Sequence, residues 1–321
     1  MRSGVNSATT IRNPSTAILA IDSEDRFENY EVQRSNPVAS SPYDFSIQKN
    51  QSLMNGFFTR IGLTEVVFPW VIPNISIGRD RIIASYGPVG GPYASSVVFI
   101  PPGFYTPSQV AAALQTSLRT TTGNVLLTVT YGSIVTPSIT SISPNFQVST
   151  NDGTNIFFNA IPNGSYPFGS IKSTTRQLFD MLGFSIVNTY AATGQIGGAT
   201  FCQLIKYIDI VCNQLTYNQD LRDAMSQTVN RDVICRLYLN NNTTPTNILP
   251  NSPAFCPIGC APFTIYRDFN TPKMIQWSPN QPINGSLRFE VFDDSGESLS
   301  SYPVGPYNGE NWSMTLLVSE N

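Results

Sequence analysis

The chain has 321 residues, of which 41% are hydrophobic and only 12% are charged, and its formal net charge is −3. This length suffices for one large all-β domain or two smaller ones, and the low charge suits a protein that packs against neighbours. The 18 Lys and Arg residues are scattered without a basic run of five, which excludes a nucleic-acid-binding patch. No apolar stretch approaches the roughly 20 residues that cross a bilayer, so we expect no membrane-spanning segment.

The N-terminus predicts where the chain folds. Residues 1–15 are polar and end in Asn13-Pro14-Ser15, which predicts a flexible N-terminal arm. Because the segment Met1–Asn6 lacks the apolar region of a signal peptide, we expect folding in the cytoplasm rather than secretion.

The N-terminal third then predicts strands, followed by one clear helix. The predicted strands are Thr16–Asp22, Tyr43–Gln48, Phe57–Trp70, Arg79–Tyr86 and Ser96–Ile100. Thr106 is a good N-cap and Pro107 suits the first helical position. Apolar residues recur at helical spacing as far as Leu118, so the pattern predicts a helix over Pro107–Leu118.

The middle of the chain mixes strands with a second short helix. The predicted strands are Val125–Tyr131, Phe146–Ser149 and Ile156–Phe158. A helix is expected over Thr174–Leu182, closed by Gly183.

From residue 200 onward the pattern is a series of strands separated by Asn, Pro and Gly turns. The predicted strands are Cys202–Val211, Asp232–Leu239, Phe263–Tyr266, Met274–Trp277, Leu287–Phe292 and Ser313–Val318. In the last strand Trp312, Met314, Leu316 and Val318 alternate with mostly polar residues, which predicts one buried face.

These elements predict an all-β fold, a single jelly-roll sandwich with an inserted small α+β domain. The jelly roll is expected to be discontinuous, over residues 16–77 and 198–321. The insertion is expected over residues 78–197, because this segment contains the clear helix and its sequence pattern differs from that of the flanking segments.

The five cysteines all lie between positions 202 and 260, and the chain has no histidine. Their number is odd, so at least one is unpaired within the chain, and a four-ligand zinc site is disfavoured. We expect Cys202, Cys212 and Cys235 to be buried free thiols inside strands; a disulfide or metal role for Cys256 and Cys260 is the alternative.

The chemistry of an enzyme is missing from the sequence. Without histidine the commonest general base is absent, and no phosphate-binding glycine loop or nucleophile elbow occurs. The carboxylates Asp22, Glu24 and Asp25, and separately Asp293 and Asp294, suit a hard cation but lack the ligand count of a known loop. We therefore predict a non-enzymatic protein with no catalytic, cofactor-binding or metal-binding residues and no cofactor.

Several short segments resemble one family of proteins. Ile21-Asp22-Ser23-Glu24-Asp25-Arg26 resembles the Ile-Asp-Ser-x-Asp-Arg start of capsid proteins from virophages and nucleocytoplasmic large DNA viruses. Further segments resemble their penton and minor capsid proteins in the same order: Pro42–Ile47, Ile61–Pro69, Ile100–Thr106, Leu178–Phe184, Arg267–Trp277 and Phe289–Gly296.

This resemblance implies a penton (vertex) capsid protein, five copies of which close each icosahedral vertex of the virion as a homopentamer. The implied partners are neighbouring major capsid protein capsomers and minor capsid proteins. No functional residue carries over, because the family's function lies in shape and interfaces. Two alternatives remain: a minor capsid or cement protein of the same lineage, and a carbohydrate-binding fibre or lectin-like β domain, to which the 14 Tyr and 19 Phe residues would contribute.

Overall fold

The chain is built mainly from antiparallel β-strands with few helices, as the computed structural model shows. The structure describes residues 16–26, 41–49, 58–132, 135–136, 139–140, 145–162, 177–184, 195–196, 205–216, 233–239, 261–270, 274–276, 285–301 and 309–320. The predicted all-β fold class is confirmed.

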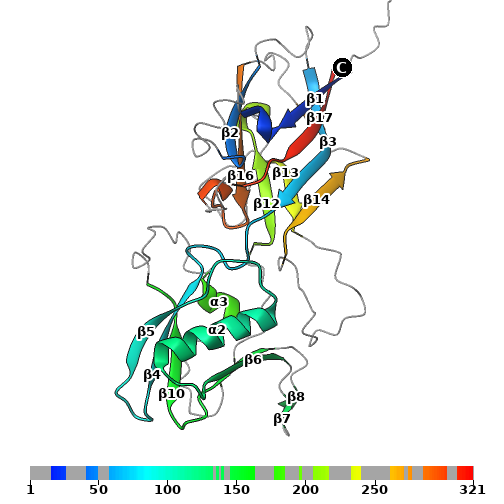
Figure 1. The fold of residues 1–321 in the computed structure, drawn as a ribbon. Coiled ribbons are helices and arrows are strands. Elements are labelled where there is room, and N and C mark those ends of the chain that lie inside the picture. Colours follow the sequence, from blue (N-terminus) through cyan, green and yellow to red (C-terminus); the bar gives the residue numbers. More distant parts are fainter. Residues whose placement is uncertain are drawn as a thin grey trace, which may run out of the picture.

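Among the described residues, two antiparallel sheets, of five and four strands, lie at the same end of the molecule (Figure 1). The first sheet has the order β1 (Thr16–Asp22), β17 (Ser313–Glu320), β3 (Phe58–Trp70) and β14 (Phe263–Asp268), and a short strand, β15 (Met274–Gln276), also pairs with β3. The second sheet has the order β13 (Val233–Tyr238), β12 (Tyr207–Val211), β16 (Gly285–Asp293) and β2 (Asp44–Lys49).

The order of these strands is that of a jelly roll. Counted along the chain without β15, the first sheet contains strands one, eight, three and six, and the second contains strands five, four, seven and two. The chain thus crosses repeatedly between the sheets, and its last strand lies between its first and third strands. Two nested Greek keys of this kind define the jelly-roll fold, so this part of the prediction is confirmed.

The core between the two sheets is centred on aromatic side chains. The ring of Trp312 lies 5.7 Å from the ring of Phe45 and 6.4 Å from that of Phe289, both on the second sheet. It also lies 5.9 Å from the ring of Phe68 on the first sheet. The indole Nε1 donates a hydrogen bond of 2.6 Å to the carbonyl of Pro42. Trp312 therefore joins both sheets.

The predicted burial alternation of two strands is confirmed. Tyr43, Phe45 and Ile47 are all buried. Trp312, Met314, Leu316 and Val318 are likewise buried, whereas the residues between them are half-buried.

Between β3 and β12 the chain forms a second set of elements, which Figure 1 shows at the opposite end of the molecule from the jelly roll. One sheet has the order β10 (Asn155–Asn159), β4 (Arg81–Gly87) and β5 (Ala94–Phe99). Another has the order β11 (Gln195–Ile196), β9 (Asn145–Ser149) and β6 (Thr128–Gly132), and β7 (Val135–Thr136) pairs with β8 (Ile139–Thr140). The helices are α2 (Pro107–Thr122) and α3 (Leu178–Leu182).

Helix α2 begins as its sequence predicts, but it extends to Thr122, beyond the predicted end at Leu118. Thr106 and Gln109 form a reciprocal capping box, and Pro107 occupies the first turn. Gly123 ends the helix with φ +72°, a conformation that glycine adopts without steric cost. The buried face of α2 contains Val110, Ala111, Leu114 and Leu118.

Several predicted boundaries need correction. The strand expected over Cys202–Val211 begins only at Tyr207, and residues 205–206 are described but lie outside it. The strand expected over Val125–Tyr131 begins only at Thr128, because Asn124 folds the chain into a turn by accepting a hydrogen bond from the Leu126 amide. Val125 and Leu126 are consequently exposed despite being apolar. The short helix begins at Leu178, after its N-cap Gln177, and residues 174–176 of its predicted range lie outside the described residues.

The buried hydrophobic residues fall into two separate clusters. The jelly-roll core comes from residues 19–72 and 205–318. A second cluster, here called the distal core, comes only from residues 75–184. We propose that residues 78–197 fold as an inserted domain around the distal core.

The insertion proposal predicts that the jelly roll folds without the distal core. Replacing residues 74–203 by a short Gly/Ser linker is expected to leave a soluble protein that unfolds in one cooperative transition, because the jelly-roll core keeps all of its buried side chains. Denaturant unfolding followed by tryptophan fluorescence measures this. A broad, non-cooperative transition would contradict the proposal.

The position of Trp312 predicts a large loss of stability when its ring is removed. Trp312→Ala is expected to lower the free energy of unfolding by about 3–5 kcal/mol, since it leaves a cavity in contact with both sheets. Ile18→Ala is the control, because Ile18 is on a strand of the same sheet but 69% exposed, and should change stability by less than about 0.5 kcal/mol. Equal effects of the two substitutions in chemical denaturation would show that the aromatic cluster is not the centre of the core.

Candidate functional site

The junction between the two cores begins directly after β3. Asn74, which is nearly buried, accepts hydrogen bonds of 3.0 Å from the amides of Ile75 and Tyr105 through its Oδ1 atom. Its Nδ2 atom donates to the carbonyl of Tyr105 at 2.7 Å. Ile75 and Gly103 also exchange a pair of backbone hydrogen bonds. The chain is therefore fixed to the distal elements within a few residues of leaving the jelly roll.

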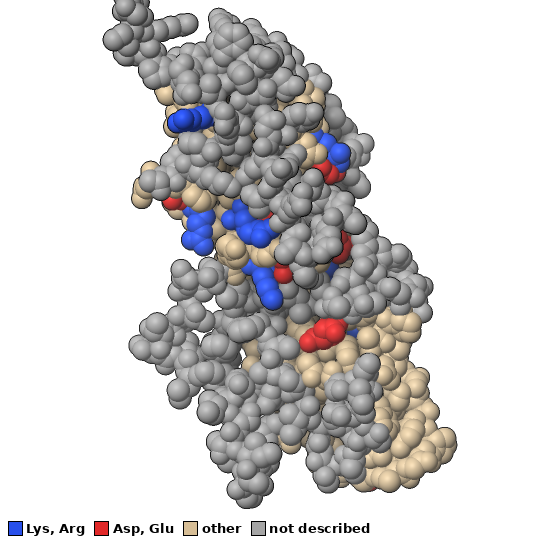
Figure 2. Space-filling model, turned by 180° about the vertical axis from the view of Figure 1, so that it is seen from behind, with Lys and Arg blue, Asp and Glu red and all other residues tan. Residues whose placement is uncertain are grey.

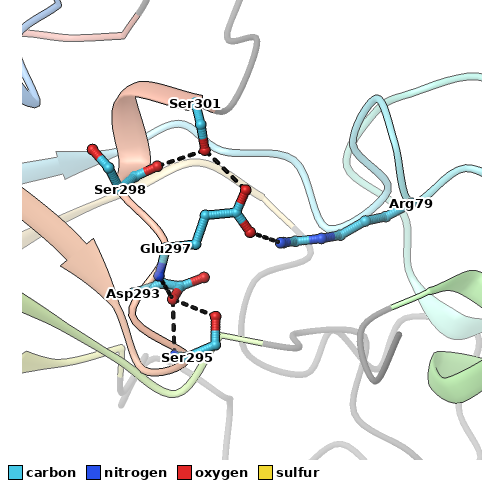
Figure 3. Close-up of polar contacts among 6 residues, drawn as sticks. All are labelled: Arg79, Asp293, Ser295, Glu297, Ser298 and Ser301. Carbon is cyan, nitrogen blue, oxygen red and sulfur yellow. Dashed lines mark hydrogen bonds and ion pairs between the residues drawn. The ribbon is translucent and has the colours of Figure 1, made fainter. Parts of the chain in front are cut away.

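An ion pair connects the distal segment with the turn after β16 (Figure 3). Arg79 Nη2 lies 3.2 Å from Glu297 Oε2, and the two side chains are only 11% and 10% exposed. Ser301 donates to the other carboxylate oxygen of Glu297 at 2.9 Å.

The turn that carries Glu297 is itself ordered by a buried carboxylate. Asp293 Oδ1 accepts hydrogen bonds from the amides of Ser295 and Glu297 at 2.8 and 2.9 Å and from the Ser295 hydroxyl at 2.6 Å (Figure 3). These bonds order the turn from which Glu297 reaches Arg79. The junction can thus set the orientation of the distal core on the jelly roll.

Of the five carboxylates considered for a cation, Asp22 and Asp293 accept local hydrogen bonds. Asp22 Oδ1 accepts from the amide of Glu24 at 2.8 Å, in the turn that leads into the 3-10 helix η1 (Ser23–Arg26). Asp293 is engaged in its own turn, as described above. Within the described parts of the chain, no group of three or more His, Cys, Asp or Glu side chains is placed to hold a metal ion.

Two of the five cysteines lie in the described part of the chain. Cys212 and Cys235 are buried free thiols, and burial raises the pKa of each thiol to about 12. Because the thiolate is the reactive form, burial disfavours reaction of both thiols. The prediction of buried thiols is confirmed for these two, and Cys202, Cys256 and Cys260 lie outside the described residues.

The two edges of the second jelly-roll sheet present different charged clusters. At the β13 edge, Arg236 donates to both carboxylate oxygens of buried Asp209 at 2.7 and 2.8 Å. These hydrogen bonds raise the pKa of Arg236, whose guanidinium also lies 3.9 Å from the ring centroid of Tyr207. Tyr238, beside Tyr207, is 56% exposed. Arginine and tyrosine are the residues most enriched at protein interfaces.

At the opposite edge, Arg288 on β16 reaches across to β2. It donates to both carboxylate oxygens of Asp44 at 3.0 and 2.9 Å and lies 3.1 Å from Glu290 Oε1. Neither cluster was predicted from the sequence. Each pair joins residues from different strands, so the available signal was a charged residue inside an apolar strand, such as Asp209 or Arg236.

Charge is distributed unevenly along the molecule. Between Arg81 and Lys172 the sequence contains only two charged residues, Arg119 and Asp152. In Figure 2 the described charged side chains lie over the jelly roll and the junction, whereas the described surface of the far end shows none. No helix among the described residues is long and apolar enough to cross a membrane.

No family model matches the sequence, and no curated protein matches it. Among solved structures, the crystal structure of the mavirus penton protein is 11% identical over 95% of this chain and 100% of that chain, with a TM-score of 0.52. A chain of the Sputnik virophage structure, determined by cryo-EM, is 12% identical over 95% of this chain and 98% of that chain, with a TM-score of 0.41. The first similarity shows that this chain has the jelly-roll fold of the mavirus penton protein.

The junction predicts energetic coupling between Arg79 and Glu297. Each single substitution, Arg79→Met or Glu297→Gln, leaves a nearly buried charge without its partner, so the double variant should lose less stability than the sum of the two. A double-mutant cycle by chemical denaturation is expected to give a coupling of about 1–3 kcal/mol.

The matched control for this cycle is the more exposed pair Arg288–Asp44, whose side chains are 52% and 32% exposed. Its coupling should stay below about 1 kcal/mol. A junction coupling no larger than the control would show that the ion pair does not hold the two cores together.

Proposed function

We propose that this chain is a non-enzymatic capsid protein that forms homopentamers, the pentons, at the fivefold vertices of an icosahedral virion. Its partners are neighbouring major capsid protein capsomers and minor capsid proteins. It folds in the host cytoplasm before assembly. The observation that carries the proposal is the single jelly roll that the chain shares with the mavirus penton protein.

The edges of the second jelly-roll sheet support a ring. A closed ring of identical subunits requires two different patches on each copy, since each copy meets its two neighbours through different surfaces. The Arg236–Tyr207 cluster near the β13 edge and the Asp44–Arg288 cluster near the β2 edge supply two such different patches toward opposite edges of one sheet.

The chemistry of the described residues agrees with a structural role. The buried carboxylates Asp209 and Asp293 accept hydrogen bonds from within the chain, and burial raises the pKa of the thiols of Cys212 and Cys235. The low overall charge reduces repulsion between copies that pack side by side.

Localisation in the particle tests the proposal directly. A cryo-EM reconstruction of particles that contain this chain is expected to place its jelly roll around the fivefold axes in five copies. Density for the chain in capsomers of threefold symmetry, or only on the inner surface of the shell, would contradict the penton role. Particles that carry a Tyr238→Asp variant test the patch at the β13 edge. The variant is expected to lower the occupancy of the vertices and to leave the thermal stability of the purified protein unchanged.

A further inference from the structure

Strand β5 lies at an open edge of the distal sheet. The sheet has the order β10-β4-β5, and β5 pairs only with β4 among the described strands (Figure 1). Residues 94–97 of this strand are all exposed. The strand therefore offers its outer side to solvent.

The register shows which backbone groups of β5 face outward. Ile100 donates its amide proton to the carbonyl of Asp80, so even-numbered residues of β5 bond to β4. The backbone groups of odd-numbered residues therefore point away from β4. In agreement, the carbonyl of Phe99 accepts a hydrogen bond from the hydroxyl of Ser117 on α2. The amide and carbonyl groups of Ser95 and Val97 consequently point away from the sheet. The described residues provide no partner for them.

This edge lacks the features that normally block strand addition. Natural proteins protect edge strands with charged side chains, prolines or bulges. The edge strands of the jelly roll follow this rule: β1 contains Asp22, β2 contains Asp44 and Lys49, β13 contains Arg236, and β14 contains Arg267 and Asp268. Strand β5, with the sequence Ala-Ser-Ser-Val-Val-Phe, contains neither a charge nor a proline.

An apolar strip lies beside the open edge. Val97 and Phe99 are 52% and 42% exposed, and Ile83 pairs directly with Val97 on the neighbouring strand. Apart from Arg81, whose guanidinium lies over the ring of Phe99, this part of the sheet carries no charge. A strand added at β5 would cover this strip with its own alternate side chains.

We propose that β5 accepts an extended, uncharged segment of another capsid-associated protein, which pairs with Ser95 and Val97 as an additional strand. Alternating amide and carbonyl groups are complementary to an extended polypeptide backbone, and the uncharged surroundings favour a segment with apolar alternate residues. The choice of another protein rests on the proposed function. A β5–β5 contact between copies is twofold, and it would leave one copy of every five without a partner.

Hydrogen exchange of the β5 amides tests the inference. In the purified full-length protein the amides of Ser95 and Val97 should exchange rapidly, whereas those of Ser96 and Val98 are protected by β4 and serve as internal controls. In intact particles the exchange of Ser95 and Val97 should slow by about tenfold or more. Unchanged exchange in particles whose vertices contain the chain would overturn the inference and leave the penton role intact.

A proline substitution separates the backbone contact from the side chain. Val97→Pro removes the outward amide proton of this residue and leaves the amides that bond to β4 in place, whereas Val97→Thr changes the side chain and keeps the amide. In particles with equal vertex occupancy, Val97→Pro should lose the added strand in cryo-EM density and Val97→Thr should retain it. If instead the purified protein forms dimers that Val97→Pro abolishes, the occupant is a second copy, and the proposed partner is wrong.

Discussion

The jelly roll depends on a contact between its two sheets that is made by Trp312. This residue immediately precedes the last strand, and its ring contacts Phe68 on one sheet and Phe45 and Phe289 on the other. The last strand lies between β1 and β3, so removing it would divide the first sheet. Both sheets are thus held in place by residues near the end of the chain, and the outer surfaces of the sandwich are free to carry charged clusters.

The junction connects this sandwich to a second core of different surface character. Asn74 fixes the outgoing chain within a few residues of β3, and the buried Asp293 orders the turn that presents Glu297 to Arg79. Charged side chains are concentrated on the jelly roll and at the junction, whereas the distal elements are almost uncharged. The two ends of the molecule therefore suit different kinds of contact.

Local patterns in the sequence predicted most helices and strands. They did not predict the contacts between residues far apart in the sequence. Alternation located the buried faces around Phe45 and Trp312, and the Thr106 cap with Pro107 located α2. The prediction that Val125 and Leu126 belong to a strand was wrong, because a hydrogen bond to the side chain of Asn124 overrides their strand propensity. The pairing of Asp209 with Arg236 depends on the register of two strands. The pairing of Arg79 with Glu297 depends on how the two cores pack. Local sequence patterns predict neither the register nor the packing.

Folding during synthesis must follow the order of these contacts. The described residues of the distal core lie within residues 75–184, so they are synthesised before β12, β13 and β16 of the second jelly-roll sheet. The jelly roll cannot close until β17 has emerged to separate β1 from β3. Pairings this distant in sequence form slowly, and until then β1 and β3 expose edges prone to aggregation. The distal core, which carries few charges, can thus fold in the nascent chain before the sandwich is complete.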